Sequence, residues 1–459
     1  MLLCMLILSN MATYSFTRSF FSTSTLEVYR DRAEAGLFWE VWDILENKYF
    51  RPVDKEQMIR GALKGMLQSL EDPHTAYLSP ESMEDMLIHT TGSLSGIGVE
   101  IVEDEGEIFV LKVLDNSPAL QVGLARGDCI VEVDGHSMDG IKLDEAARLL
   151  RGVSGTEVNI IVRRAGEEEP MSFTITRAKI EVETVFAHFL ESEIGYIKIS
   201  NFDQGTGKNF REALVLLEKE GLKGLVLDLR DNAGGLLDEA VAVGESIVPS
   251  GEITRVVDRE GKVQERYFSQ AKPKDYKIAV LVNEYTASAA EIIAGALQDS
   301  GGAELVGKPT FGKATVQYLH YLSDGGGIRY TIAKYLTPSG KDLHLQGLQP
   351  DFKVELPPEY YLQYYTIPRQ LKDGDAGEKV ILLQNMLLFL GYPTKITGVF
   401  DLSTAGFLKD FQKKHGLPAT GTIDMATREH FRSALSAKAD EVDEQLLFAL
   451  DILKGRSTP

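Results

Sequence analysis

The chain is poor in several features that mark particular classes of protein. It has only two cysteines in 459 residues, Cys4 and Cys129, so a disulfide framework is not indicated. It also has no excess of positive charge, because 48 lysines and arginines stand against 68 aspartates and glutamates, a formal net charge of −20. A nucleic-acid partner requires a basic surface that displaces counterions from phosphates, so none is expected.

Long apolar runs are lacking as well. The stretch from Met1 to Leu8 is apolar, but it is too short to span a bilayer, which takes about 20 helical residues, and no basic residue precedes it. We interpret residues 1–25 as a clipped signal or anchor segment. A buried N-terminal segment is the alternative for the same residues.

What the chain does contain is typical of globular proteins. Hydrophobic residues make up 44% and charged residues 25% of the sequence. At this length a single hydrophobic core is not expected, and about three domains are. We see no fixed-period repeat and no low-complexity array, so solenoid architectures are not indicated.

The patterning along the chain predicts a multidomain protein of mixed α+β and α/β class. Apolar residues at helical spacing indicate a helical N-terminal arm over residues 26–90, and short β-rich runs with one helix follow over residues 91–178. Residues 179–357 alternate strands with helices, which is typical of an α/β layer. A compact helical module over 371–436 and an amphipathic helix over 440–455 end the chain. Catalytic residues are expected at the strand-to-helix turns of the α/β layer.

One such turn carries a serine. The apolar strand from Lys277 to Val282 leads through a polar turn into a helix, which places Ser288 at or near the helix N-terminus. A nucleophilic serine would gain from this position, because the oxyanion formed on attack can accept a hydrogen bond from the amide of Ala289. The alternative is that Ser288 or Thr286 simply caps the helix.

A nucleophilic serine needs a base, and the sequence favours a lysine. The eight histidines are scattered, and none has a defensible acidic partner. Lys313 lies in a glycine-flanked turn with Gln317 four residues later, so in a helix the two side chains would share a face and the amide could orient the amine. The site would have to desolvate Lys313 to keep it neutral. A solvated surface lysine is the alternative.

A second oxyanion donor is predicted in the glycine pair that follows an apolar strand. The strand beginning at Gly224 ends before Gly234 and Gly235, whose lack of a side chain would let a main-chain amide approach a bound carbonyl. A tight turn that needs positive φ explains either glycine equally well.

Together these segments resemble the C-terminal processing, or tail-specific, proteases, a family of serine–lysine endopeptidases. The matching motifs, in chain order, are Phe38–Trp42, Gly61–Thr75, Ser95–Gly98, Gly195–Ser200, Leu229–Gly235, Thr286–Glu291, Gly312–Lys313, Tyr335–Gly340 and Gln349–Asp351.

The resemblance implies a crotonase-like α/β protease core, with Ser288 as the nucleophile, Lys313 as the general base and Gln317 as the residue that positions the lysine. The expected oxyanion donors are the amide of Ala289 and the amide of either Gly234 or Gly235, of which we prefer Gly235. One departure is Ala233, where the family commonly has proline, which puts the rigidity of the glycine turn in question.

The β-rich block is similar to a PDZ domain. Gly123–Gly135 resembles the family's hairpin signature, and Ser117–Ala119 precedes it. PDZ domains bind an extended peptide as an added strand and hold its terminal carboxylate on main-chain amides. The residues that match this carboxylate loop are Gly96, Ile97, Gly98 and Val99. A glycine-rich strand entry without a ligand is the alternative. Arg151 follows the groove helix and is a candidate link between bound tail and protease core, with a solvated arginine as the alternative that the sequence favours.

The helical module is similar to small three-helix peptidoglycan-binding domains. Its turns Gly398–Asp401 and Thr420–Asp424 are pseudo-repeats that would join helices around a shallow groove. Such modules also serve as spacers or protein-docking units. The final helix resembles the family's terminal core helix, so we interpret the module as an insertion in the protease core.

We therefore predict a serine endopeptidase that captures protein C-terminal tails in its PDZ groove and needs no metal or cofactor. Its expected partners are C-terminal tails, peptidoglycan and a second copy of the chain in a homodimer. Its expected location is outside the cytoplasm of a bacterium, in the cell envelope or on the extracellular face of the membrane. The alternatives are a non-catalytic PDZ and wall-binding scaffold, and a peptidoglycan hydrolase, which would want paired carboxylates or zinc.

Overall fold

The computed structural model describes residues 33–80, 82–83, 86, 93–104, 106–164, 166–181, 183–191, 193–368 and 371–456. The predicted signal or anchor segment, residues 1–25, lies outside these residues. The chain divides into two compact units, Met1–Tyr77 and Leu78–Pro459. Among the described residues, we find no helix with the length and apolar character that a membrane crossing requires.

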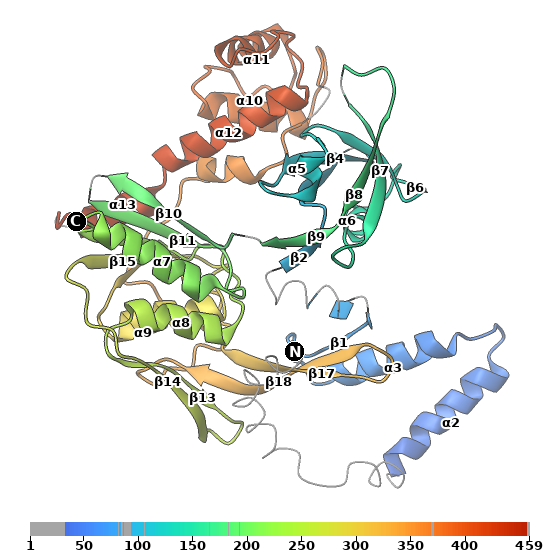
Figure 1. Cartoon of the computed structure of the whole chain (residues 1–459), viewed down its shortest axis with the longest axis vertical. Coiled ribbons are helices and arrows are strands. Elements are labelled where there is room, and N and C mark those ends of the chain that lie inside the picture. The colour runs from blue at the N-terminus through green and yellow to red at the C-terminus, as the bar shows by residue number, and fades with distance from the viewer. Residues whose placement is uncertain are drawn as a thin grey trace. The chain divides into compact units, whose positions relative to one another are not determined.

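The first unit contains the two helices that the sequence predicts for its N-terminal arm, drawn in blue in Figure 1. They are α2 (Ala33–Lys48) and α3 (Lys55–Gln68), and the short strand β1 (Ala76–Leu78) begins at the end of the unit. Asp54 caps α3 by accepting hydrogen bonds from the amides of Glu56 and Gln57, at 2.9 and 3.1 Å. Large apolar side chains of α2 are exposed, Leu37 by 66% and Trp39 by 58%.

The second unit begins with the β domain. Its strands are β2 (Ser93–Gly96), β3 (Val99–Asp104), β4 (Glu107–Val113), β5 (Cys129–Val133), β6 (His136–Ser137), β7 (Glu157–Arg163), β8 (Met171–Thr176) and β9 (Ala178–Glu181). β2 pairs with β9, while β3, β4, β5, β7 and β8 follow one another across an antiparallel sheet. The helices are α5 (Pro118–Gln121) and α6 (Leu143–Leu150). Alternate residues of β7, Val158, Ile160 and Val162, are buried, as the two-residue period of a strand requires.

The α/β core is built on a six-stranded sheet (Figure 1). In spatial order its strands are β10 (Val185–Glu191), β11 (Ile194–Ile199), β12 (Gly224–Asp228), β15 (Lys277–Val282), β16 (Glu304–Gly307) and β19 (Phe352–Lys353). β11 to β19 are parallel, and β10 is an antiparallel edge strand. The helices are α7 (Thr206–Lys219), α8 (Leu237–Ile247), α9 (Ala289–Asp299) and α13 (Glu444–Leu453).

Both faces of this sheet are covered. Leu225 and Leu227 of β12 pack in a cluster with apolar side chains of α7, α8 and α9. The residue between them, Val226, points to the opposite face and packs with Ala449 and Ile452 of α13. A parallel strand buried on both sides reads as a continuous apolar run, and all five residues of β12 are buried.

A second, antiparallel sheet and a tyrosine-rich segment complete the core. The sheet contains β13 (Gly251–Val257), β14 (Val263–Ser269), β17 (Thr315–Tyr321) and β18 (Gly327–Leu336). The tyrosine-rich segment forms the 3₁₀ helix η2 (Pro358–Tyr364), which leads from the core toward the helical module.

The helical module has the predicted three helices, α10 (Glu378–Phe389), α11 (Leu402–Lys414) and α12 (Met425–Glu441). Its two predicted pseudo-repeats are held by equivalent buried glutamines. Gln384 accepts hydrogen bonds from the amides of Thr397 and Gly398, both at 2.9 Å, and Gln412 accepts one from the amide of Gly421, also at 2.9 Å. The predicted fold class, with a β domain, an α/β core and a three-helix module, is confirmed.

Candidate active site

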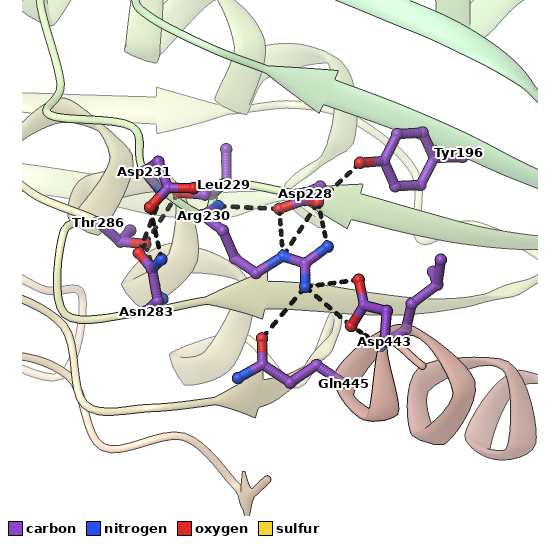
Figure 2. Close-up of polar contacts among 10 residues, drawn as sticks. Tyr196, Asp228, Leu229, Arg230, Asp231, Asn283, Thr286, Asp443 and Gln445 are labelled. Carbon is purple, nitrogen blue, oxygen red and sulfur yellow. Dashed lines mark hydrogen bonds and ion pairs between the residues drawn. The ribbon is translucent and has the colours of Figure 1, made fainter. Parts of the chain in front are cut away.

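Ser288 lies in the turn between β15 and α9, at the N-cap position of the helix. The turn is tied to the end of β12, because the Thr286 hydroxyl donates to the carbonyl oxygen of Leu229 at 2.8 Å (Figure 2). The same hydroxyl accepts from the amide of Asn283 at 3.0 Å. Thr286 therefore stabilises the turn from within and is not the helix cap.

The backbone of Ser288 adopts an unusual conformation. Its φ is 55° and its ψ is −119°, in a region that residues with a side chain rarely occupy. Such strain costs about 1–3 kcal/mol and is maintained only where the surroundings enforce it, often at active sites. A sharp strand-to-helix turn of this kind exposes a serine hydroxyl at the edge of a sheet.

Ser288 and Lys313 are both hydrogen-bonded to the carboxylate of Glu291. It is fully buried, and one of its oxygens accepts hydrogen bonds from the amides of Ser288, at 2.9 Å, and of Lys313, at 2.8 Å. The other oxygen accepts from the Thr310 hydroxyl at 2.5 Å and from the amide of Gly312 at 2.8 Å. The two predicted catalytic residues are thus neighbours in the folded chain.

A tyrosine joins the same two residues a second time. The Tyr335 hydroxyl lies 3.0 Å from the main-chain carbonyl oxygen of Ser288 and also contacts that of Lys313. Its side chain is only 2% exposed, and burial raises its pKa well above the ordinary value, so the hydroxyl keeps its proton. Glu291 and Tyr335 were not identified from the sequence, although the Ser-x-x-Glu spacing of Ser288 and Glu291 is that of a capping box.

The surroundings of Lys313 favour its neutral form. Burial lowers the pKa of the Lys313 amine, and the positive charge of Arg329 on β18 lowers it further, while the carboxylate of Glu291 opposes both effects. An amine acts as a general base only when it is unprotonated at the working pH. The electrostatics around Lys313 therefore suit the predicted base.

The prediction that Lys313 and Gln317 share a helix face is wrong. Lys313 lies in a loop, and Gln317 lies in strand β17. The amide nitrogen of Gln317 donates to the hydroxyl of Thr315 at 2.7 Å and to the Thr315 carbonyl oxygen at 2.9 Å. A spacing of four residues fits a shared helix face and an extended strand alike, and the β-branched and aromatic residues of 315–318 favour the strand.

The glycine turn after β12 lies directly against Ser288. A Cβ placed on Gly234 would be 2.7 Å from the Cβ of Ser288 and 2.9 Å from the amide nitrogen of Ala289. The Gly234 amide donates to the Asn232 side chain at 2.8 Å. By contrast, the amides of Gly235 and Ala289 make no hydrogen bond within the described part of the chain. Neither amide is therefore engaged within these residues.

The glycine turn is held in place by Asn232, although Ala233 stands where the family commonly has proline. Besides accepting from Gly234, its side chain donates to the carbonyl oxygen of Ile199 at 2.7 Å. Its main-chain carbonyl accepts from the amide of Ala287 at 2.8 Å, one residue before Ser288. The turn is therefore fixed by a buried asparagine.

In the β domain, the predicted carboxylate loop joins β2 to β3. Ile97 is buried, and Gly98 has a φ of 81°, which favours glycine. Arg151 is the C-cap residue of α6, and its Cγ lies 3.9 Å from the position that a Cβ of Gly96 would take. The loop and Arg151 thus lie side by side at the end of the groove helix.

The described residues contain no cluster of three or more histidine, cysteine, aspartate or glutamate side chains arranged to hold a metal ion. Cys129 is buried in β5, and Cys4 lies outside the described residues.

Four family models match successive parts of the chain. They describe the N-terminal domain of the activating protease CtpB over residues 12–82, a PDZ domain over 109–164, peptidase family S41 over 193–354 and a peptidoglycan binding domain over 376–430.

The chain is also similar to curated proteins over most of its length. It is 36% identical to the carboxy-terminal processing protease CtpA of Bacillus subtilis, over 90% of this chain and 89% of that protein. It is 33% identical to CtpB of the same organism, over 94% of this chain and 91% of that protein. A solved photosystem II D1 C-terminal processing protease is 30% identical, with a TM-score of 0.43, and the match covers 71% of this chain and 95% of the other.

The fold, the site and the matched families define a serine-type peptidase joined to a PDZ domain and a peptidoglycan-binding-type module. The chain belongs to peptidase family S41 of C-terminal processing proteases.

Proposed function

We propose that this protein is an endopeptidase in which Ser288 is the nucleophile and Lys313 the general base. The observation that carries the proposal is the double connection of the two residues, since their amides share one Glu291 oxygen and their carbonyls share the Tyr335 hydroxyl. The lowered pKa of Lys313 supports its role as a base.

In the proposed reaction, the neutral Lys313 amine accepts the proton of the Ser288 hydroxyl as Oγ bonds to the carbonyl carbon of the scissile peptide. The oxyanion accepts hydrogen bonds from the amides of Ala289 and Gly235. The C–N bond then breaks, and the Lys313 ammonium donates its proton to the leaving amine. A water molecule, deprotonated by Lys313, hydrolyses the acyl-enzyme and releases Ser288.

Gln317 is proposed to position the lysine from strand β17. Its amide nitrogen is held by Thr315, while its side-chain oxygen accepts no hydrogen bond within the described residues. That oxygen can accept from the Lys313 amine. Gln317→Leu should then lower kcat, whereas Gln317→Glu should protonate Lys313 more strongly and shift the acid limb of the activity profile to higher pH.

The direct test uses an unstructured protein tail as substrate. Ser288→Ala and Lys313→Ala should each abolish cleavage and leave the thermal unfolding transition in place. Ser300→Ala, at the other end of α9, is the matched control and should cleave at the wild-type rate. Undiminished turnover in either of the first two variants rules out the assignment.

The PDZ domain is proposed to recognise the C-terminal carboxylate of the substrate on the loop of Gly96, Ile97, Gly98 and Val99, with Arg151 linking the bound tail to the protease core. A peptide with a free carboxylate should bind, and the same peptide with an amidated C-terminus should not. Arg151→Ala should change turnover, peptide binding or both. If neither changes, Arg151 has no such role.

A non-catalytic PDZ and wall-binding scaffold is the alternative function. A serine-reactive phosphonate separates the two, because the protease proposal requires covalent labelling of Ser288 and a scaffold gives none. Incubation with purified cell wall and with a protein tail, in parallel, distinguishes a peptidoglycan hydrolase from a peptidase.

We further propose that the protein is exported to the bacterial envelope or the extracellular face of the membrane and is a homodimer that binds peptidoglycan. The exposed apolar residues of α2, such as Leu37 and Trp39, support pairing with a second copy. Trp39→Glu should shift the mass measured by light scattering from dimer to monomer. Wall binding is tested by co-sedimentation of the full chain with purified peptidoglycan.

A further inference from the structure

We propose that Arg230 and Asp443, which form a buried ion pair, are positioning residues that set the place of the Gly235 amide in the oxyanion site. This inference rests on the proposed Ser288 mechanism and adds a function for the last helix of the chain.

Arg230 is the centre of a buried polar network at the end of β12 (Figure 2). Its side chain is 7% exposed, and its guanidinium donates to both carboxylate oxygens of Asp228, the shortest distance being 2.7 Å. On the other side it lies 2.8 Å from a carboxylate oxygen of Asp443 and 3.3 Å from the side-chain oxygen of Gln445. The guanidinium is therefore held from two directions, by its own strand and by the start of α13.

The charges of this network stabilise one another. Burial opposes ionisation of Asp228, but the charge and hydrogen bonds of Arg230, the charge of Lys198 and the hydrogen bond from Tyr196 together outweigh burial, and the pKa of Asp228 is lowered. The Tyr196 hydroxyl also donates to Asp228, at 2.7 Å. A buried, fully paired ion network adds little net stability compared with apolar packing of the same volume, but it restricts the geometry of its members strongly. We therefore propose that the network serves to fix the geometry of its residues and not to add stability.

What the network restrains is the direction in which the chain leaves β12. Asp231 follows Arg230 with a φ of 62°, and this conformation is fixed from the opposite side by Asn283. The Asp231 amide donates to the Asn283 side chain at 3.0 Å, and the Asn283 amide group donates back at 2.8 Å. Four residues after Asp231 comes Gly235. A rotation of the chain at Arg230 would displace the Gly235 amide relative to Ala289.

Asp443 connects helix α13 to this network through its ion pair with Arg230. It caps α13 by accepting from the amide of Leu446 at 3.0 Å, so its carboxylate is fixed by the helix that it begins. Gln445 donates to the carbonyl oxygen of Val354 at 2.9 Å. Because α13 follows the three-helix module in the chain, the residues after the module complete the support of the oxyanion turn.

The test compares Asp443→Asn with Asp424→Asn in the full-length protein. Both aspartates are N-caps, and asparagine remains a good cap, so each variant removes one charge without removing the capping acceptor. Asp424 caps α12 and makes no ion pair within the described residues, whereas Asp443→Asn loses the charge that pairs with Arg230.

For Asp443→Asn we expect kcat to fall roughly tenfold with KM unchanged, less than the 10²–10³-fold loss that removal of one oxyanion donor causes. Affinity for a peptide boronate, which forms a tetrahedral adduct with Ser288, should fall by the same factor, while affinity for a tail peptide stays constant. Asp424→Asn should match the wild type in all three measurements. A variant that only destabilised the fold would lower the affinities for the boronate and for the tail peptide together.

Unchanged kcat and boronate affinity in a folded Asp443→Asn protein overturn the proposal. If that variant fails to fold, Tyr196→Phe decides, because it removes only the hydrogen bond to Asp228. A smaller loss of boronate affinity in Tyr196→Phe supports the positioning role, and wild-type affinity overturns it. Ser288→Ala is run alongside: continued cleavage there refutes the Ser288 mechanism itself, whereas an inactive Ser288→Ala beside a fully active Asp443→Asn refutes only the positioning role.

Discussion

Buried polar side chains are satisfied differently in the three-helix module and in the protease core. In the module, Gln384 and Gln412 are neutral and direct their hydrogen bonds into the turns of their own pseudo-repeats. In the core, Glu291 is a buried carboxylate whose donors include the main-chain amides of Ser288 and Lys313. The first arrangement holds a fold together, and the second connects the two residues that we propose as nucleophile and base.

The energetics differ in the same way. Burial raises the pKa of Glu291, and hydrogen bonds from Thr310 and the nearby amides oppose this only in part. A carboxyl group whose pKa is raised in the folded state adds stability at low pH and loses it as the pH rises through that pKa. The contribution of Glu291 to stability therefore falls as the pH rises, whereas the neutral glutamines of the module make no pH-dependent contribution.

The helix N-caps show a second contrast. Asp401 and Asp424 have extended backbones, and each accepts from an amide one turn into its helix at 2.7 Å. Ser288 occupies the same position on α9 with a φ of 55°. The two aspartate caps are formed without strain, so capping alone does not account for the backbone conformation of Ser288.

The largest effect is expected from Lys313→Arg. An arginine cannot lose its proton at working pH, so cleavage should fall by about 10²–10⁴-fold, the contribution of a general base. Lys308→Arg is the matched control. Burial alone would lower the pKa of Lys308, but its interactions with Glu284, Tyr361 and Glu355 together outweigh burial and raise that pKa. It should keep wild-type turnover. Initial rates on one fluorogenic peptide measure both, and an active Lys313→Arg protein would contradict the base assignment.

Glu291→Gln should have the next largest effect. The amide group offers one acceptor oxygen in place of two. Depending on which oxygen is replaced, either the amide of Ser288 or the hydroxyl of Thr310 loses its acceptor. We expect kcat to fall by up to about 10²-fold, because small displacements of reacting groups have effects of that size, and unfolding to become easier by about 1–3 kcal/mol. Denaturant unfolding and turnover check the two parts. Wild-type kcat would show that the carboxylate does not position the site.

A smaller, pH-dependent effect is expected from Arg329→Gln. The positive charge of Arg329 lowers the pKa of Lys313, so its removal should let that pKa rise. The neutral amine would then form only at higher pH, the acid limb of kcat/KM would move upward, and activity at neutral pH would fall several-fold. A pH profile that does not move would show that Arg329 does not lower the pKa of Lys313.

The smallest effect on turnover is expected in the module. Gln384→Leu leaves buried turn amides such as those of Thr397 and Gly398 without an acceptor, which should destabilise the module by about 1–3 kcal/mol. Cleavage of a soluble peptide should be unchanged. Calorimetry and peptide assays on the same sample test this, and a large loss of turnover would mean that the module contributes directly to the active site.

The sequence was sufficient to predict the fold class and the strand-to-helix turn of Ser288. Periodicity and glycine placement locate such elements because they reflect local packing and backbone freedom. Tyr335 lay within a matched motif but had no predicted role, since its contacts join residues 47 and 22 positions away. Arg230 was missed for the same reason, because its partner Asp443 lies 213 positions later. Gln317 was placed on the wrong element because its spacing from Lys313 fits both periods.

The most direct measurement is the rate at which a serine-reactive phosphonate labels Ser288 across pH, in the wild type and in Lys313→Arg. The account predicts that wild-type labelling rises with pH below the range in which an exposed lysine loses its proton, and that the variant is labelled hardly at all. Equal labelling of Ser288 in the two proteins at every pH would contradict it.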